Sequence, residues 1–292
     1  MLLSALFFAT LAVLARLAYE QGARPLPLLS WRFTMAALLI GGYLAVRRPG
    51  ELRAGLQHLP RYAALSLTGY GAASICFFFA LQHVSASVVA VLLYTYPVIV
   101  ALLAVPVLGE RLTPSRIAAL AVTFAGCVLV VGVLEERVSV DPAGIALALG
   151  AGAGYAAFTL LSQKLVAGHS RLVTMAYTFG LSAVGVTLVT LLAGESLSPS
   201  AWTGRLWLLL VGIVALPTFA AVALYLRGIR ELGAPQAAVL STAEPVFTIG
   251  LAAVILGERL TALQFAGVAL VVAGIVIAEW PDRMSADVAV PL

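Results

Sequence analysis

The chain has 292 residues, of which 62% are hydrophobic and 10% are charged, and its formal net charge is +4. Soluble domains carry roughly 45–50% apolar and about 25% charged residues, so this composition excludes a soluble enzyme, a disordered chain and a disulfide scaffold. One membrane span needs about 20 apolar residues, so the length accommodates about ten spans. The composition is that of an integral membrane protein.

Ten apolar stretches follow one another with short connections. Each is about 20 residues long and continuous, which is typical of helices and not of the roughly ten-residue alternating strands of a barrel. We therefore expect an all-α fold with ten transmembrane helices. In chain order the predicted spans are Leu2–Ala18, Leu28–Val46, Tyr62–Ala80, Ala86–Leu108, Arg116–Leu134, Gly144–Leu165, Leu172–Ala193, Leu206–Leu226, Ala234–Leu256 and Ala262–Ala278.

The distribution of Lys and Arg predicts the orientation of these spans. The side that holds the N-terminus carries eleven of them and the other side carries five, with Arg32 set aside because it lies within a span. Cytoplasmic loops are enriched in Lys and Arg. Because ten spans return the chain to its starting side, we expect both termini to be cytoplasmic.

The second half of the chain repeats the first. Pro97 and the segment Gly109–Thr113 (Gly-Glu-Arg-Leu-Thr) recur as Pro245 and Gly257–Thr261, a shift of 245 − 97 = 148 residues. Over Ala86–Val128 and its counterpart Ala234–Val276, about two in five positions are identical without a gap. We therefore divide the chain into a first repeat over residues 1–138, a second over 139–282 and a cytoplasmic tail over 283–292.

Each repeat holds five predicted spans, an odd number, so consecutive repeats must insert in opposite orientations. Inverted repeats of this kind are a recurring architecture of secondary transporters, in which the substrate binds between the halves. The sequence thus predicts two inverted five-helix repeats around a central cavity. We expect spans one to four and six to nine to line it, because the fifth and tenth hold few aromatic or polar residues.

The arrangement resembles the EamA group of the drug/metabolite transporter superfamily. The resemblance is carried by the Pro-containing helix, the Gly-Glu-Arg-Leu corner and the final Gly-bearing helix of each half, and by the segment Ala80–Ser87. It implies a multi-pass carrier of the bacterial inner membrane that exports amino acids or other small metabolites, most similar to aromatic amino-acid exporters. Small multidrug exporters of the superfamily bind cations with a glutamate in the first helix, and the span Leu2–Ala18 has no acidic residue.

Ionisable residues inside a bilayer are costly and are therefore candidates for function. Glu244 lies about ten residues into its span, near the middle of the membrane. It is predicted to bind a substrate ammonium group or a proton, or else to pair with Arg32 or the broken backbone. Arg32 is predicted to bind a substrate carboxylate, or else to extend to the membrane interface.

Prolines mark the expected helix breaks. A proline lacks the N–H group that continues a helix, so Pro97, Pro217 and Pro245 are predicted breaks or hinges. Two symmetry-related breaks near the midplane would expose backbone groups to a polar substrate. Tyr94 and Tyr96, beside the first break, are predicted to contact its apolar part.

The remaining substrate-binding candidates are aromatic or polar residues of the spans expected near the cavity. His83 is expected either to gate the exit by titrating near neutral pH or to cap its helix. These further candidates are Trp31, Tyr70, Phe77, Gln82, His83, Tyr155 and Tyr177.

The leading hypothesis is a secondary transporter that exports amino acids, including aromatic ones, by alternating access. The alternatives are a carrier of lipophilic cations or nucleotide sugars, and a passive channel. We expect no enzyme activity, cofactor, metal site or nucleic-acid partner. The expected partners are a small-molecule substrate and the lipid bilayer, for a monomer or homodimer.

Overall fold

The computed structural model describes most of the chain, and every regular element in that part is a helix. The described residues are 1–80, 82–84, 86–110, 113–131, 141–166, 168–200, 202–256 and 261–279. Glu258 and Arg259 of the second Gly-Glu-Arg-Leu corner, Arg111 of the first and the predicted tail over 283–292 lie outside them.

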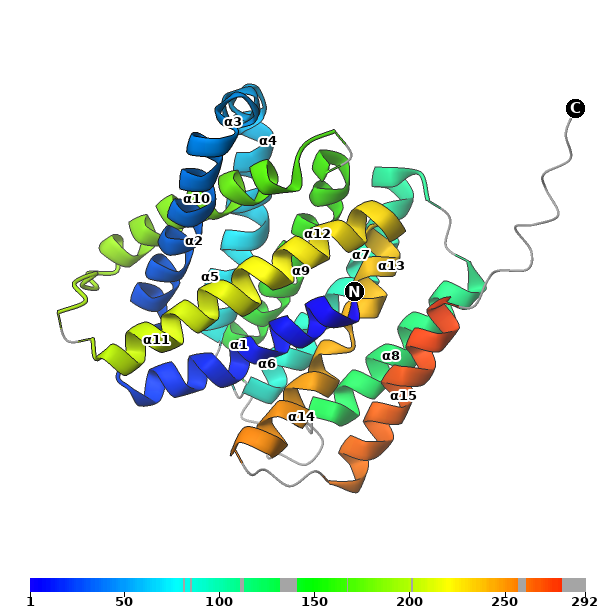
Figure 1. The fold of residues 1–292 in the computed structure, drawn as a ribbon. Coiled ribbons are helices and arrows are strands. Elements are labelled where there is room, and N and C mark those ends of the chain that lie inside the picture. The colour runs from blue at the N-terminus through cyan, green and yellow to red at the C-terminus, as the bar shows by residue number, and fades with distance from the viewer. Residues whose placement is uncertain are drawn as a thin grey trace, which may run out of the picture.

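The helices of the first half begin at the N-terminus and end with α8 (Figure 1). Short elements follow one another without a gap from α3 to α5, and α4, η2 and α5 run on as one long rod. The elements are α1 Leu2–Glu20, α2 Pro25–Arg47, α3 Pro49–Gly55, η1 Leu56–His58, α4 Leu59–Ala63, η2 Ala64–Tyr70, α5 Gly71–Ala80, α6 Ala86–Leu93, α7 Tyr96–Leu108 and α8 Pro114–Val131.

The second half follows the same plan. It also contains a rod of three consecutive elements, from α11 to α12, and a helix interrupted in the middle. Its elements are α9 Pro142–Val166, α10 Arg171–Leu192, α11 Gly204–Ile213, η3 Val214–Ala220, α12 Ala221–Leu232, α13 Ala234–Ser241, α14 Glu244–Leu256 and α15 Ala262–Glu279.

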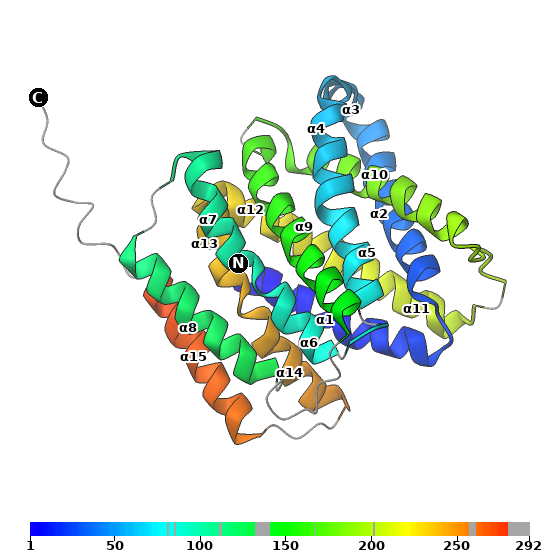
Figure 2. The same ribbon diagram turned by 180° about the vertical axis from the view of Figure 1, so that it is seen from behind.

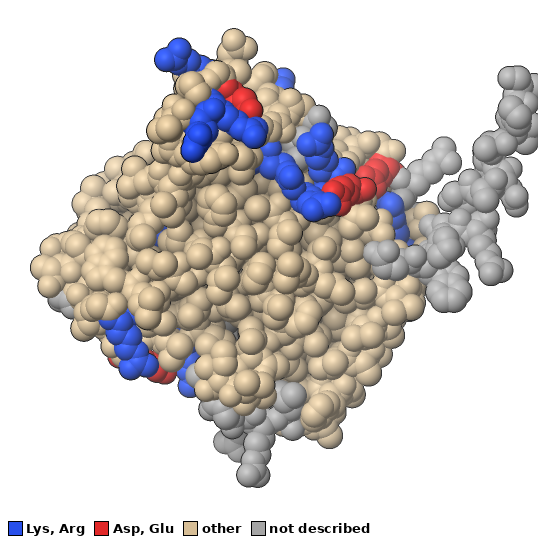
Figure 3. Space-filling view, in the orientation of Figure 1, with Lys and Arg blue, Asp and Glu red and all other residues tan. Residues whose placement is uncertain are grey.

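Among the described residues, nine helical stretches are long and apolar enough to cross a membrane, and Ala262–Ala278 is a shorter apolar helix. The charged side chains support the same view. On the face shown in Figure 3, Lys and Arg gather at the top and in a smaller group at the lower left, and a broad belt of largely uncharged surface lies between them. Such a belt is what a bilayer requires of the surface that faces its hydrocarbon.

The helices α8 and α15 pack side by side in both ribbon views (Figures 1 and 2). Glycines allow the two backbones to approach closely: Gly126 faces Gly267 and Val271, and Gly274 faces Ala119 and Thr123. Later residues of α8 meet earlier residues of α15, so the pair is antiparallel. The two sets of contacts are also interchanged by the 148-residue shift, because 126 + 148 = 274 and 123 + 148 = 271.

The two prolines of the repeat lie just after helix interruptions. The chain leaves α6 at Leu93 and enters α7 at Tyr96, and it leaves α13 at Ser241 and enters α14 at Glu244. Pro97 and Pro245 are each the second residue of the new helix, a position where the missing N–H group costs no hydrogen bond.

Two further irregularities are π-helical. η2 and η3 each widen the helix over seven residues in the middle of a long rod. Pro217 lies within η3. π-Helical segments are rare in proteins, and those that occur are often found at functional sites. Five buried positions within and just after η2 (Leu65, Ser66, Gly69, Tyr70, Ala73) recur as buried positions of η3 and its flanks (Ile213, Val214, Pro217, Thr218, Ala221) at the same 148-residue shift.

Candidate functional site

A cavity of about 100 Å³ lies among the helices of both halves. Its walls combine aromatic rings with one cationic and one acidic side chain. Residues from α1, α2, η2, α5, α6, the α6–α7 junction, α7, α9 and α14 contribute. They are Phe8, Leu11, Arg32, Tyr70, Ala73, Ser74, Phe77, Phe78, Leu93, Tyr94, Tyr96, Tyr155 and Glu244.

The structure brings together seven of the predicted binding residues in this cavity: Arg32, Tyr70, Phe77, Tyr94, Tyr96, Tyr155 and Glu244. As expected, α8 and α15 contribute no lining residue to it. Nor do α10 and α12, which correspond to the seventh and eighth predicted spans. Fewer helices therefore line the cavity than the sequence suggested.

Glu244 begins α14 at the second helix interruption. Its backbone carbonyl accepts a hydrogen bond from the Thr248 hydroxyl at 3.0 Å. Within the described part of the chain, its carboxylate accepts no hydrogen bond and belongs to no ion pair, so it does not pair with Arg32. An acidic side chain at the N-terminus of a helix interacts favourably with the helix dipole. The carboxylate lies at the cavity wall, and no described residue donates a hydrogen bond to it.

Arg32 lies in the second turn of α2 and is only 3% exposed, so it does not extend to the membrane surface. Its Nε donates to the hydroxyl of Thr218 at 2.6 Å, and its Nη2 donates to the hydroxyl of Tyr70 at 3.0 Å. The guanidinium carbon also lies 5.2 Å from the centre of the Phe33 ring. The charge is thus held inside the protein by two hydroxyl groups and one aromatic face.

Tyr94 and Tyr96 flank the first helix interruption and are both buried. The Tyr96 hydroxyl donates to the backbone carbonyl of Ala238 in α13 at 3.3 Å, which joins one interrupted helix to the other. The Tyr96 ring packs edge-on against Tyr155, with ring centres 4.8 Å apart. The ring centre of Tyr155 in turn lies 5.8 Å from that of Tyr225.

The other predicted contacts lie outside the cavity. The Trp31 ring packs against Trp202 and Trp207, and its indole N–H donates to Leu197. Tyr177 stacks on Tyr62 and donates to the carbonyl of Leu52. These aromatic residues support the helix ends and do not line the cavity.

Gln82 and His83 are exposed at the end of α5. His83 Nδ1 lies 2.7 Å from Oδ2 of Asp141, and a carboxylate can only accept, so the imidazole donates. Asp141 also accepts from the backbone N–H of Ala143 and caps the start of α9. The imidazole hydrogen bond holds the pKa of the Asp141 carboxyl below its usual range, and the cap contributes in the same direction.

Several cavity residues were not among the binding residues predicted from the sequence, namely Phe8, Leu11, Ala73, Ser74, Phe78 and Leu93. Most are apolar and indistinguishable in sequence from residues that face lipid. Thr218, which holds Arg32, was also missed. The one available signal was the 148-residue shift, because 70 + 148 = 218 relates Thr218 to Tyr70.

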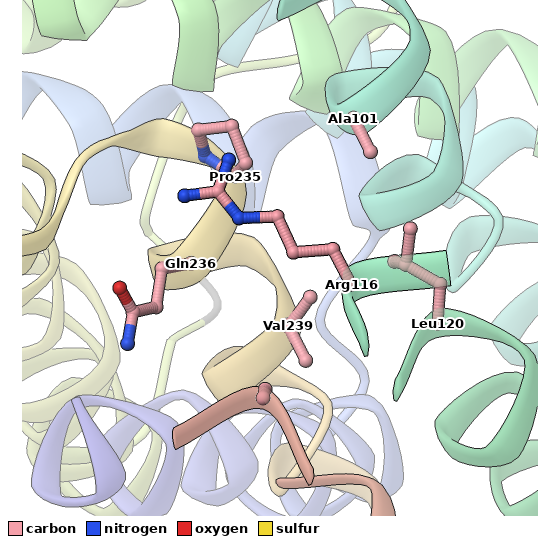
Figure 4. A pocket seen from close by; sticks show the side chains of 7 residues that line it. Ala101, Arg116, Leu120, Pro235, Gln236 and Val239 are labelled. Atoms are coloured by element: carbon pink, nitrogen blue, oxygen red, sulfur yellow. The ribbon is translucent and has the colours of Figure 1, made fainter. Parts of the chain in front are cut away.

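A second hollow between α7, α8, α13 and α15 is too small for a substrate. It measures about 10 Å³, room for about one water molecule. Figure 4 shows Arg116 extending from α8 toward Pro235 and Gln236 of α13 across this hollow. Arg116 Nη1 also lies 2.9 Å from Oε2 of Glu110, so this ion pair ties the residue after Gly109 to the start of α8.

Comparison with known proteins places this architecture in a family. The model of the EamA-like transporter family matches the chain twice, over residues 1–132 and 142–280. The chain belongs to the EamA-like transporter family. As a member of this family it is a multi-pass membrane transporter. In the part of the chain that the structure describes, there is no group of three or more His, Cys, Asp or Glu residues that could hold a metal ion.

Individual relatives agree with the family. An uncharacterized transporter of Bacillus subtilis (strain 168), YwfM, is 31% identical over 290 residues, covering 97% of this chain and 93% of its own length. A second from the same organism, YcbK, is 29% identical over 282 residues, covering 91% and 87%. A solved structure, titled only as a crystal structure of a protein, has a TM-score of 0.80 at 22% identity and covers 95% of this chain and 94% of its own, which shows a shared fold.

Proposed function

We propose that this transporter exports small zwitterionic metabolites, amino acids including aromatic ones, across the bacterial inner membrane. The observation that carries the proposal is the presence, in one cavity, of an anchored cation, Arg32, and a carboxylate that has no partner among the described residues, Glu244. An α-amino acid carries one charge of each sign. Its carboxylate is complementary to Arg32 and its ammonium group to Glu244.

The aromatic walls supply the rest of the recognition. Tyr70, Phe77, Tyr94 and Tyr96 offer apolar ring surface together with phenolic hydroxyls, which suits an aromatic or large aliphatic side chain. The volume of about 100 Å³ is well below the roughly 300–1,000 Å³ of pockets for drug-sized ligands, and it therefore favours a small metabolite over a nucleotide sugar.

The transport cycle that we propose is alternating access between two inverted repeats, residues 1–138 and 139–282. The antiparallel packing of α8 with α15, and the helix interruptions 148 residues apart, support a two-fold relation in the membrane plane. Exchange of conformation between the halves would open the cavity to one side and then to the other. The excess of Lys and Arg on the side of the N-terminus supports cytoplasmic termini.

The test is counterflow in liposomes that contain the purified protein. Vesicles loaded with unlabelled phenylalanine are expected to accumulate radiolabelled phenylalanine transiently and with saturation, and a screen of the twenty amino acids with and without a pH gradient defines range and coupling. No flux above empty vesicles for any amino acid would overturn the proposal. Single-channel currents without saturable counterflow would favour a passive channel.

A lipophilic-cation carrier is the second candidate, favoured by the carboxylate of Glu244, which lies among aromatic rings and has no partner in the part of the chain that the structure describes. A competition panel separates the two candidates. Tetraphenylphosphonium is expected to inhibit phenylalanine counterflow weakly, because it offers no anion to Arg32, and a nucleotide sugar is expected not to inhibit. Direct accumulation of tetraphenylphosphonium in the absence of amino-acid counterflow would decide for the cation carrier.

A further inference from the structure

Arg32 is held by one residue from each half of the chain. Its Nε donates to Thr218 in η3 and its Nη2 donates to Tyr70 at the end of η2. Tyr70 and Thr218 are 218 − 70 = 148 residues apart, the spacing of the internal repeat. A single guanidinium group therefore joins the two π-helical segments at corresponding positions.

The chemistry of η3 fixes the direction of the Thr218 hydrogen bond. Pro217 has no N–H group, so a regular helical bond from this residue to the carbonyl of Ile213 is impossible. The Thr218 hydroxyl donates its one hydrogen to that carbonyl at 2.8 Å. Its oxygen can then only accept from Arg32, and the guanidinium is consequently held in one orientation.

Arg32 still has donors to spare. A guanidinium group carries five N–H bonds. Two of them are used by Thr218 and Tyr70, and the structure gives Arg32 no other hydrogen bond and no ion pair within the residues it describes. Since Arg32 lines the cavity, the remaining donors are available to an anion there, and a planar guanidinium group suits a carboxylate.

We propose that Thr218 is a positioning residue, which acts with Tyr70 to aim Arg32 at a carboxylate of the substrate. Thr218 is buried and does not line the cavity, so its influence on the substrate passes through Arg32. This inference rests on the proposed function. It adds that selectivity for an anionic group is set jointly by the two halves, at their π-helical segments.

The test compares Thr218→Val with Thr218→Ser in reconstituted counterflow. Valine has the shape of threonine without the hydroxyl, so the KM for phenylalanine is expected to rise about tenfold while the maximal rate changes less than about twofold. Serine keeps the hydroxyl and is expected to restore the KM. Competition by phenylalaninamide, which lacks the carboxylate, is expected to be the same in wild type and in both variants.

The outcomes separate this inference from the proposed function. Absence of phenylalanine counterflow in the wild type overturns the proposed function and this inference with it. Normal wild-type counterflow with an unchanged KM in Thr218→Val, or an equal loss of phenylalaninamide competition, overturns the positioning role alone. Should Thr218→Val fail to fold, Tyr70→Phe removes the other acceptor of Arg32; a rise in its KM for phenylalanine supports the role, and an unchanged KM overturns it.

Discussion

The two interrupted helices have the same backbone plan and different chemistry. In each of them, two residues separate the end of one helix from the start of the next, and the next helix begins one residue before a proline. That helix begins at Tyr96 in the first half and at Glu244 in the second. These two residues are 244 − 96 = 148 apart and both line the cavity. The tyrosine hydroxyl is bonded to Ala238, whereas the carboxylate has no partner in the described chain.

The comparison shows that the 148-residue repeat is kept in the backbone at the helix interruptions and lost in the side chains of Tyr96 and Glu244. A two-fold relation can supply equivalent movements from equivalent backbones, but a substrate with distinct ends needs side chains that differ between the halves. The same division recurs at Tyr70 and Thr218, which occupy corresponding positions and hold one Arg32 between them. Under the proposed function, the backbone repeat would serve motion and the side-chain differences would serve recognition.

The largest expected effect comes from removing the charge of Glu244, the acidic side chain among the described residues that line the cavity. Glu244→Gln keeps the shape of the side chain and removes its charge, so phenylalanine counterflow is expected to fall at least tenfold, in line with about 2–5 kcal/mol for truncating a buried charged partner. The folded state should remain, as judged by size-exclusion chromatography and circular dichroism.

Glu231→Gln provides the matched control, because Glu231 is exposed and its Oε1 lies 2.7 Å from Nε of the equally exposed Arg227. Exposed ion pairs contribute little, and transport by this variant should equal that of the wild type. Counterflow by Glu244→Gln with unchanged kinetics across pH would remove Glu244 from the mechanism and with it the contrast between the two interrupted helices.

The next effect concerns stability and probes the equivalence of the halves. A Cβ added to Gly126 would lie 2.7 Å from the backbone nitrogen of Val271, and one added to Gly274 would lie 2.9 Å from that of Thr123. Because backbone atoms cannot move aside easily, Gly126→Ala and Gly274→Ala should each destabilise the protein by about 1–3 kcal/mol. Thermal melting in detergent measures both.

Gly41→Ala is the control for these glycines, because a Cβ there meets nothing within 4 Å. Its melting temperature should match or slightly exceed that of the wild type, since alanine favours a helix over glycine. Folded Gly126→Ala protein should still transport, because neither α8 nor α15 lines the cavity. If only one of Gly126→Ala and Gly274→Ala destabilised the protein, the two glycine contacts between α8 and α15 would not be energetically equivalent.

Much of this architecture could be predicted from the sequence. Long apolar runs require helices, and the recurrence of Pro97 and the Gly-Glu-Arg-Leu corner predicts the paired interruptions that α6–α7 and α13–α14 display. Arg32 and Glu244 stood out because charge within a span is rare. The partners of Arg32 could not be found in this way, because they depend on which faces of η2 and η3 turn toward α2.

Two aromatic residues that do not line the cavity illustrate the same limit. Trp31 and Tyr177 are of the residue types that often bind ligands, but Trp31 packs in a tryptophan cluster and Tyr177 stacks on Tyr62. Helical periodicity gives the face of a residue only relative to its own helix. Its neighbours depend on the rotation of each helix in the bundle, which an almost uniformly apolar sequence specifies weakly.

A smaller effect is expected at the first interrupted helix. Tyr96→Phe removes the hydroxyl that reaches Ala238 at 3.3 Å and leaves the ring packed on Tyr155. A neutral hydrogen bond contributes about 0.5–1.5 kcal/mol, so counterflow should fall by about two- to tenfold, less than in Glu244→Gln. Tyr43→Phe, at an exposed site on α2, should have no effect. A larger loss in Tyr96→Phe than in Glu244→Gln would reverse the proposed division of roles.

The smallest effect is expected where the halves meet outside the membrane, at Asp141 and His83. The pKa of Asp141 is lowered in the folded protein, so its ionised form adds stability above the ordinary carboxyl range, and this stability is lost as the pH falls through the lowered value. The melting temperature of Asp141→Asn should therefore lie slightly below that of the wild type at pH 6, and the difference should shrink as the pH falls below the ordinary carboxyl pKa of about 3.9 and vanish only below the lowered value. Asparagine keeps the cap on the Ala143 N–H, so Asp141→Ala should melt lower than Asp141→Asn at every pH. A difference between wild type and Asp141→Asn that persists unchanged into the acid range would show that the carboxylate contributes by its shape and not by its charge.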